Sequence, residues 1–244
     1  MEQRLSVGDA LSEVFRIYRE HAGVLLPVAF WLFLIVAVVN GLTEDNFSLF
    51  WLSLIVSLAV GTLYQGTVVE LVQDVQDGRR DSSVGDLMRS ALPVLGTLVA
   101  AGILAGIGIG IGFVLLVVPG LFLATIWAVI APAIVVERRG VFEAFGRSRE
   151  LVKGQGWPVL GTIVVAYLIA FVAEIAFAAI AANIADGKIV GIVASALAST
   201  IAAPIGALVA AVLYFRLLAI KGETASPAST SPPSVPQQPG DNLG

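Results

Sequence analysis

One ionisable residue lies inside a long apolar segment, and it is the first place where this chain could carry chemistry. Glu174 is flanked by uncharged stretches from 154 to 173 and from 175 to 185. It belongs to a ridge of small residues spaced by four, a spacing that places them on one helix face: Ala166, Ala170, Glu174, Ala178 and Ala182. Because charged groups within membrane helices mark ion and proton pathways, this pattern indicates a proton or cation site in a helix bundle.

The depth of Glu174 supports a second interpretation. A helix that rises about 1.5 Å per residue from Trp157 puts Glu174 roughly 25 Å up an apolar core of about 30 Å. A charge near a membrane edge costs much less than one at the centre, so the sequence favours a carboxylate wetted from the outer side. If Glu174 faces the bundle instead, we expect a hydrogen bond from Ser195, Ser199 or Thr200 of the last apolar run.

A basic, amphipathic segment follows the fourth apolar run. Its cations are candidates for contact with anionic lipid head groups: Arg138, Arg139, Arg147, Arg149 and Lys153. A cytoplasmic loop beside a membrane span carries a similar excess of Lys and Arg for reasons of topology alone. Both interpretations of the segment stay open at this stage.

Glycines recur through the third apolar run, at Gly102, Gly106, Gly108, Gly110 and Gly112. They contain three overlapping GxxxG pairs, and such pairs let two helix backbones approach closely in a membrane. We expect close packing within one chain or between copies, with a flexible gate as the alternative.

Composition restricts the class of protein. Hydrophobic residues make up 57% of the 244 residues and charged residues 13%, against about 25% charged in an ordinary soluble domain. The chain has no cysteine and one histidine, His21, so the sequence predicts no metal site and no cofactor. Acids and bases balance outside the apolar runs, which disfavours nucleic acid as a partner.

The charge-free runs are the elements that must position these residues, and they predict an all-α, polytopic membrane protein. We expect six spans, at about 22–42, 47–69, 92–116, 119–136, 157–182 and 189–213. The Pro119-Gly120 dipeptide is the strongest turn signal between the third and fourth spans. Together these elements form an integral membrane domain over 1–221, followed by a Pro- and Ser-rich tail, 222–244, that should be disordered.

Three short amphipathic segments precede the three pairs of spans. They begin near Val7, Val84 and Val141, and the first two follow the same pattern, Ser-Val-Gly-Asp. Ser6 is placed to cap the first segment. The sequence therefore predicts three interfacial helices and a three-fold repeat of interfacial helix, span, turn and span.

The distribution of Lys and Arg predicts the orientation. Of the 14 such residues, only Lys188 falls on one side of the six spans, and the other thirteen fall on the opposite side. By the positive-inside rule, both termini lie in the cytoplasm.

Several residues resemble the core pattern of the membrane domain of glycerophosphoryl diester phosphodiesterases and of related uncharacterised bacterial integral membrane proteins. They are Pro119-Gly120, Trp127, Pro132, Glu137, Gly140, Glu143-Ala144-Phe145, Arg147-Ser148, Leu151-Val152, Gly154 and Tyr214-Phe215-Arg216. The resemblance covers most of residues 5–220 and implies a bacterial plasma membrane. Some members of that family carry a cytoplasmic barrel that hydrolyses glycerophosphodiesters with His, Glu and Asp residues around a metal. With His21 as the only histidine, we expect the membrane domain without that enzyme.

Three functions follow from these features. The first is a non-enzymatic membrane scaffold or modulator, with the lipid bilayer, anionic lipid head groups, other membrane proteins or further copies of the chain as partners. The second is a small transporter or channel, which rests on Glu174, the glycine-rich third span and the kink prolines Pro132 and Pro204. The third, a lipid-active enzyme, is disfavoured because the sequence contains no evident nucleophile with a base.

Overall fold

The computed structural model describes residues 5–43, 47–78, 84–184 and 187–225. Within these ranges the secondary structure is helical, with no strand. The elements are α1 (Val7–Glu20), α2 (Ala22–Thr43), η1 (Phe47–Leu49), α3 (Phe50–Gln76), α4 (Val84–Ala91), η2 (Leu92–Val94), α5 (Leu95–Leu115), α6 (Val117–Ile126), α7 (Ile130–Glu137), α8 (Val141–Val152), α9 (Gly156–Ile184) and α10 (Lys188–Lys221).

Six helical segments in the described ranges are long and apolar enough to cross a membrane. They are Ala22–Thr43, Phe50–Gln76, Gly85–Leu115, Val117–Glu137, Gly156–Ile180 and Ile189–Lys221. The prediction of an all-α fold with six spans is confirmed, and this architecture indicates a multi-pass membrane protein.

The three short helices begin at the residues that the sequence pattern indicated, Val7, Val84 and Val141. At α1 the Ser6 hydroxyl accepts a hydrogen bond from the backbone N–H of Asp9 at 3.4 Å, as expected for an N-cap. At α8 the Glu143 carboxylate accepts one from the backbone N–H of Gly140 at 3.3 Å. Each short helix leads into one hairpin of longer helices.

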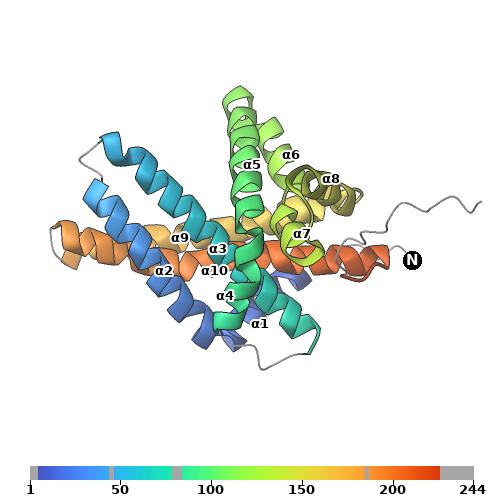
Figure 1. The fold of residues 1–244 in the computed structure, drawn as a ribbon, viewed down its shortest axis with the longest axis horizontal. Coiled ribbons are helices and arrows are strands. Elements are labelled where there is room, and N and C mark those ends of the chain that lie inside the picture. Colours follow the sequence, from blue (N-terminus) through green and yellow to red (C-terminus); the bar gives the residue numbers. More distant parts are fainter. Residues whose placement is uncertain (1–4, 44–46, 79–83, 185–186, 226–244) are drawn as a thin grey trace, which may run out of the picture.

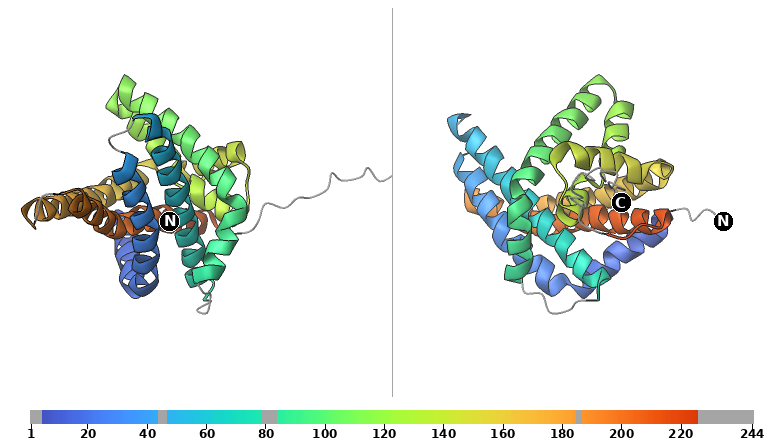
Figure 2. Two further views of the ribbon diagram at one scale, coloured as in Figure 1. Left: turned by 60° about the vertical axis from the view of Figure 1, so that its left-hand side comes forward. Right: turned by 45° about the vertical axis from the view of Figure 1, so that its right-hand side comes forward.

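The three hairpins diverge from a common region. In Figure 1 the α2–α3 and α9–α10 hairpins extend to the left and the α5–α6 hairpin extends to the top. The helices α1 and α4 lie at the bottom and α8 lies on the right. The same divergence is visible from two further directions in Figure 2. We call the region that contains α1, α4, α7, α8 and the adjoining ends of α3 and α10 the base, and the turns of the hairpins the tips.

The apolar core lies toward the base. Its fully buried residues include Val68, Val72, Ile134, Leu213 and Leu217. Helix α10 runs through this core, and 67% of the residues in its most apolar window are buried, against 11% for α9. Large side chains near the tips, such as those of Trp51 and Val114, are exposed to the surroundings of the protein. The hairpins are therefore joined near the base and present apolar surface toward their tips.

The turn between the third and fourth spans lies at Leu116, three residues before the predicted Pro119-Gly120. Leu116 has an extended backbone, and both Pro119 and Gly120 lie in the first turns of α6. Proline is tolerated there because the first N–H groups of a helix have no intrahelical acceptor. Gly120 serves the packing of α5 on α6, since a Cβ added to Gly112 would lie 2.9 Å from its Cα.

The fourth span is broken between α6 and α7, a feature that the sequence analysis did not predict. Residues 127–129 form a turn, and Ser148 of α8 bridges it. The Ser148 hydroxyl donates to the carbonyl of Ile126 at 2.8 Å and accepts from the N–H of Val129 at 3.2 Å. Trp127 packs edge-on against Phe145, with ring centroids 4.9 Å apart. The short helix α8 thus supplies a hydroxyl that bonds one backbone carbonyl and one backbone N–H at the break.

Candidate functional sites

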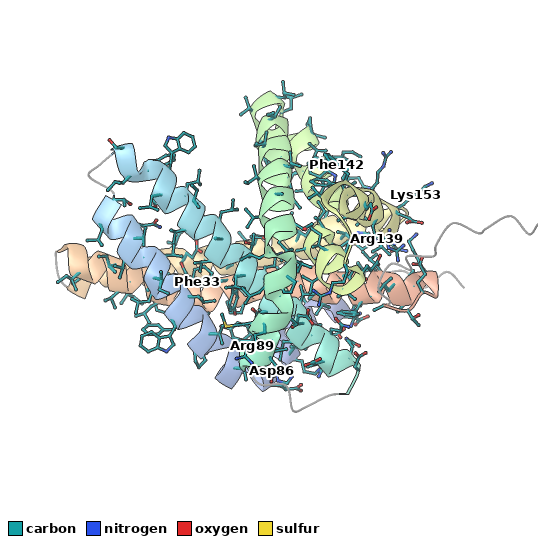
Figure 3. All side chains as sticks on the ribbon, in the orientation of Figure 1. Phe33, Asp86, Arg89, Arg139, Phe142 and Lys153 are labelled. Atoms are coloured by element: carbon teal, nitrogen blue, oxygen red, sulfur yellow. The ribbon has the colours of Figure 1, made fainter. Side chains whose placement is uncertain are left out.

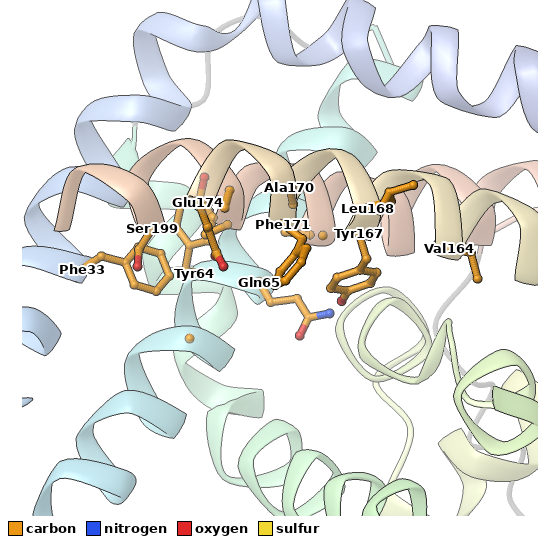
Figure 4. Close-up of a pocket in the computed structure, with 15 residues that line it drawn as sticks. Phe33, Tyr64, Gln65, Val164, Tyr167, Leu168, Ala170, Phe171, Glu174 and Ser199 are labelled. Carbon is orange, nitrogen blue, oxygen red and sulfur yellow. The ribbon is translucent and has the colours of Figure 1, made fainter. Parts of the chain in front are cut away.

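The first candidate site is a cavity of about 760 Å³ between the first and third hairpins. Glu174 and Ser199 line it, as Figure 4 shows, together with aromatic side chains from α2, α3 and α9. The room comes from small residues on α3, α9 and α10: Gly61, Ala170, Ala202, Ala203, Gly206 and Ala207. The small-residue spacing in the sequence therefore marks the place where α9 approaches α10 and leaves a hollow beside it.

Of the three hydroxyl residues predicted to hydrogen-bond Glu174, only one lines its cavity. Ser199 lines the same cavity, whereas the hydroxyl of Ser195 donates to the carbonyl of Ile192 at 2.9 Å and that of Thr200 to Ala196 at 2.7 Å. Within the described ranges, no side chain, Ser199 included, forms a hydrogen bond or ion pair with the Glu174 carboxylate. Glu174 is exposed toward the cavity and its opening.

The sequence analysis missed the uncharged polar residues of this cavity. Gln65 and Tyr64 come from α3, and Tyr167 comes from α9. The Tyr64 hydroxyl donates to the carbonyl of Leu25 at 3.4 Å and is buried, while Tyr167 is exposed. A glutamine in the middle of a span is the signal that could have indicated the site, because an amide is costly in hydrocarbon without a partner.

The second candidate site is a buried ion network at the base. The Nε of Arg147 donates to the Glu137 carboxylate at 2.8 Å, and the Tyr214 hydroxyl donates to the same carboxylate at 2.8 Å. Arg139 also pairs with Glu137, and Arg147 also pairs with Glu223. The network joins α7, α8, α10 and the segment after α10. Its residues belong to the motif that carries the family resemblance, except Arg139 and Glu223.

Burial and the neighbouring carboxylates shift the pKa of Arg147 in opposite directions. Burial alone would lower the pKa of its guanidinium, but the hydrogen bonds and charges of Glu223 and Glu137 raise the pKa above its ordinary value. Arg147 is therefore cationic throughout the physiological pH range. The side chains of Glu137 and Arg147 are 3% and 9% exposed, so the pair is strongly sheltered from water. This arrangement fixes geometry and offers no free acid or base.

Three of the five cations proposed for lipid head groups have carboxylate partners within the protein. Arg147 lies inside the network rather than at a surface, and Arg139 pairs with Glu137. Arg138 pairs with Glu70 at 3.0 Å and donates to the carbonyl of Ser90 at 3.0 Å. The contacts of Arg138 follow from the tertiary structure, since Glu70 of α3 and Ser90 of α4 lie far from Arg138 in the sequence.

The other two cations, Arg149 and Lys153, line a hollow of about 540 Å³ on the exposed side of α8. Phe122, Ile126 and Val152 form its apolar part, and Glu150, which pairs with Arg147, also lines it. Figure 3 shows Phe142 and Lys153 at opposite ends of α8. Basic groups above apolar ones suit a phospholipid, with its phosphate near the cations and its acyl chain below. The head-group hypothesis thus stays a prediction that now rests on Arg149 and Lys153.

The glycines of α5 have different surroundings. An added Cβ would lie 2.6 Å from the Trp127 ring at Gly108 and 2.9 Å from the Gly120 Cα at Gly112, so this pair serves packing within the chain. At Gly106 and Gly110 an added Cβ would meet nothing within 4 Å. The Gly108–Gly112 pair is therefore packed within the chain, whereas the Gly106–Gly110 pair faces outward.

The part of the chain that the structure describes contains no group of three His, Asp or Glu residues that could hold a metal ion. These features place the protein in the class of multi-pass helical membrane proteins. Comparison with protein-family models, with curated proteins and with solved structures finds no match to this chain. The resemblance to a phosphodiesterase membrane domain accordingly stays a hypothesis.

Proposed function

We propose that this protein is a non-enzymatic integral membrane protein that scaffolds or modulates other components of a bacterial plasma membrane. In this proposal both termini and the base face the cytoplasm, in line with the thirteen-to-one distribution of Lys and Arg. In this proposal the membrane domain is similar to that of the phosphodiesterases.

The uneven burial of the spans is the observation that carries this proposal. In the most apolar stretch of α10, 67% of the residues are buried. The corresponding shares are 17% for Gly85–Leu115 and 11% for Gly156–Ile180. Such a bundle holds its shape through α10 and the base and leaves the outer faces of α5 and α9 for lipid and for other helices. The outward pair Gly106 and Gly110 adds a surface where another backbone can approach closely.

The ionisable residues of the base support the same proposal. Glu137, Arg147 and Tyr214 bond one another, and Arg216 pairs with Glu13 at 2.6 Å to tie α10 to α1. These groups fix the relative positions of helices from all three repeats. A rigid base with exposed apolar hairpins is what a scaffold for membrane components requires.

Photocrosslinking in native membranes tests this function. A photoreactive residue at Val118, which is 75% exposed, should give a crosslinked species with the added mass of a defined membrane protein or a second copy. The same residue at Val135, which is buried, should crosslink only within the chain. Crosslinks to lipid alone from Val118 and from Ile107 on α5 would contradict a scaffold.

A small transporter or channel is the second candidate, because Glu174 lines the 760 Å³ cavity between two hairpins. Proteoliposomes that show pH-dependent flux, abolished by Glu174→Gln, would support it. Flux equal to that of protein-free liposomes would exclude it.

A further inference from the structure

The cavity between the first and third hairpins has a chemistry that a scaffold does not use. Its wall contains one carboxylate, that of Glu174, and four aromatic rings, those of Phe33, Tyr64, Tyr167 and Phe171. Most of the remaining wall consists of aliphatic side chains, alanine and glycine. A single negative charge in such surroundings is the feature that needs an explanation.

The charge of Glu174 has no counter-ion among the described residues. Its own helix carries no other charged residue from Gly156 to Ile184, and the facing stretch of α10 from Ile189 to Phe215 carries none. A carboxylate in apolar surroundings is stabilised by a cation close to it, because water is scarce there. The cavity therefore selects for positive charge.

The rings favour an organic cation. Tyr167 and Phe171 are 59% and 58% exposed, so their surfaces are available to a ligand. Phe33 and Tyr64 form an edge-on pair with centroids 5.5 Å apart, which holds both rings in place. The electron-rich face of an aromatic ring attracts an ammonium or similar cation within about 6 Å, and quaternary ammonium groups are bound in this way.

The oxygen atoms of the wall are too scattered for a metal ion. Figure 4 shows Glu174 and Ser199 at one end of the cavity and Tyr167 at the other, with Gln65 between. A calcium ion takes six to eight oxygen ligands at about 2.3–2.6 Å, which groups at opposite ends cannot supply together. A bulky organic monocation needs no set of oxygen ligands, and its apolar groups can lie along the rings while Glu174 supplies the opposite charge.

The size of the cavity agrees with such a ligand. Its volume of about 760 Å³ falls within the range of roughly 300–1,000 Å³ usual for sites that hold small organic molecules. Glycine and alanine at positions 61, 202, 203 and 206 provide this space. A Cβ added to Gly206 would already lie 3.4 Å from the Tyr167 hydroxyl, so a larger side chain would occupy part of the site.

We propose that this cavity binds a lipophilic organic monocation, of the quaternary ammonium or phosphonium class, with Glu174 as its counter-ion and the four aromatic rings as its lining. The site lies on α2, α3, α9 and α10, away from Ile107 of α5 and Val118 of α6, where the crosslinking test of the scaffold proposal is made. Either proposal can therefore fail while the other stands.

Equilibrium binding of tetraphenylphosphonium to the full-length protein in nanodiscs tests the site. We expect saturable binding at one site per chain and a loss of affinity of at least ten-fold in Glu174→Gln. The matched control is Glu150→Gln, which removes a carboxylate that is 65% exposed at the base and should leave the affinity unchanged. Triphenylphosphine oxide, a neutral molecule of similar bulk, should not compete.

Two further variants keep the test decisive if Glu174→Gln does not fold. Phe171→Leu removes an exposed ring and keeps apolar bulk, so it should weaken tetraphenylphosphonium binding at least three-fold. Gly206→Leu fills part of the cavity and should abolish binding. The proposal is wrong if the wild type shows no saturable binding, if the folded variants bind as tightly as the wild type, or if triphenylphosphine oxide competes equally.

Discussion

The carboxylate of Glu137 lies 2.8 Å from the Nε of Arg147, across the connection between α7 and α8. Both side chains are buried, and the Tyr214 hydroxyl from α10 donates to the same carboxylate. The last residue of the fourth span is thereby joined to the third short helix and to the central helix. Four predictions concern this corner of the base, the broken span, the glycines and the lipid hollow, and a fifth concerns orientation.

The buried pair should dominate the stability of the base. Arg147→Met leaves the Glu137 charge with Arg139 and Tyr214 alone, and we expect a loss of about 3–5 kcal/mol in the free energy of unfolding. The double variant Glu137→Gln with Arg147→Met should lose less than the sum of the two single variants. Unfolding in detergent measures these values. Arg16→Met, which breaks an exposed pair with Glu20, is the control and should cost less than about 1 kcal/mol.

Ser148 should be needed for the break between α6 and α7. Ser148→Ala leaves the carbonyl of Ile126 and the N–H of Val129 without this hydroxyl, so we expect about 1–3 kcal/mol of destabilisation. Ser12→Ala on the exposed side of α1 removes a comparable local hydrogen bond and should be nearly neutral. Equal melting temperatures for the two variants would show that the bridge has no energetic role.

The two kinds of glycine on α5 should respond differently to the same substitution. Gly112→Ala places a methyl group 2.9 Å from the Gly120 Cα and should lower the melting temperature. Gly106→Ala adds a methyl group in open space and should be neutral or slightly stabilising, because alanine favours a helix. A similar loss in both variants would contradict the packing of α5 on α6.

The hollow beside α8 should retain anionic lipid. We expect native mass spectrometry of the purified protein to detect bound phosphatidylglycerol or cardiolipin, with occupancy reduced several-fold in Arg149→Ala with Lys153→Ala. Arg16→Ala with Arg19→Ala removes the same charge from α1 and serves as the control. Undiminished retention in the α8 variant would contradict a lipid site at this hollow.

The predicted orientation places both termini in the cytoplasm. Because the chain has no cysteine, single cysteines can be introduced without background. Cysteine at Asn46 or Gly187 should react with an impermeant reagent added outside cells, and cysteine at Ser82 or Gly154 should react only after permeabilisation. The reverse labelling pattern would show that the topology is the opposite one, with the base outside the cell.

Local patterns in the sequence determine the helices. Charge-free runs of about 20 residues specify spans, and apolar periodicity after a capping residue specifies the helices that begin at Val7, Val84 and Val141. These signals act within one or two turns of a helix, so no knowledge of distant residues is needed to recognise them. The small-residue spacing on α9 also marked the face where α10 approaches it.

Tertiary structure alone decided the partners of the polar groups. Glu137 meets Tyr214, 77 residues further along, and Arg147 meets Glu223, which the sequence analysis assigned to the tail. Arg147 consequently lies in a buried network, although the basic composition of the segment around it suggested a surface position. The cavity likewise combines residues of four helices, and the sequence analysis named Glu174, Ser199 and Ala170 of its lining but none of its aromatic rings. Such contacts depend on how the hairpins pack together near the base. The local periodicity of the sequence carries no information about that packing.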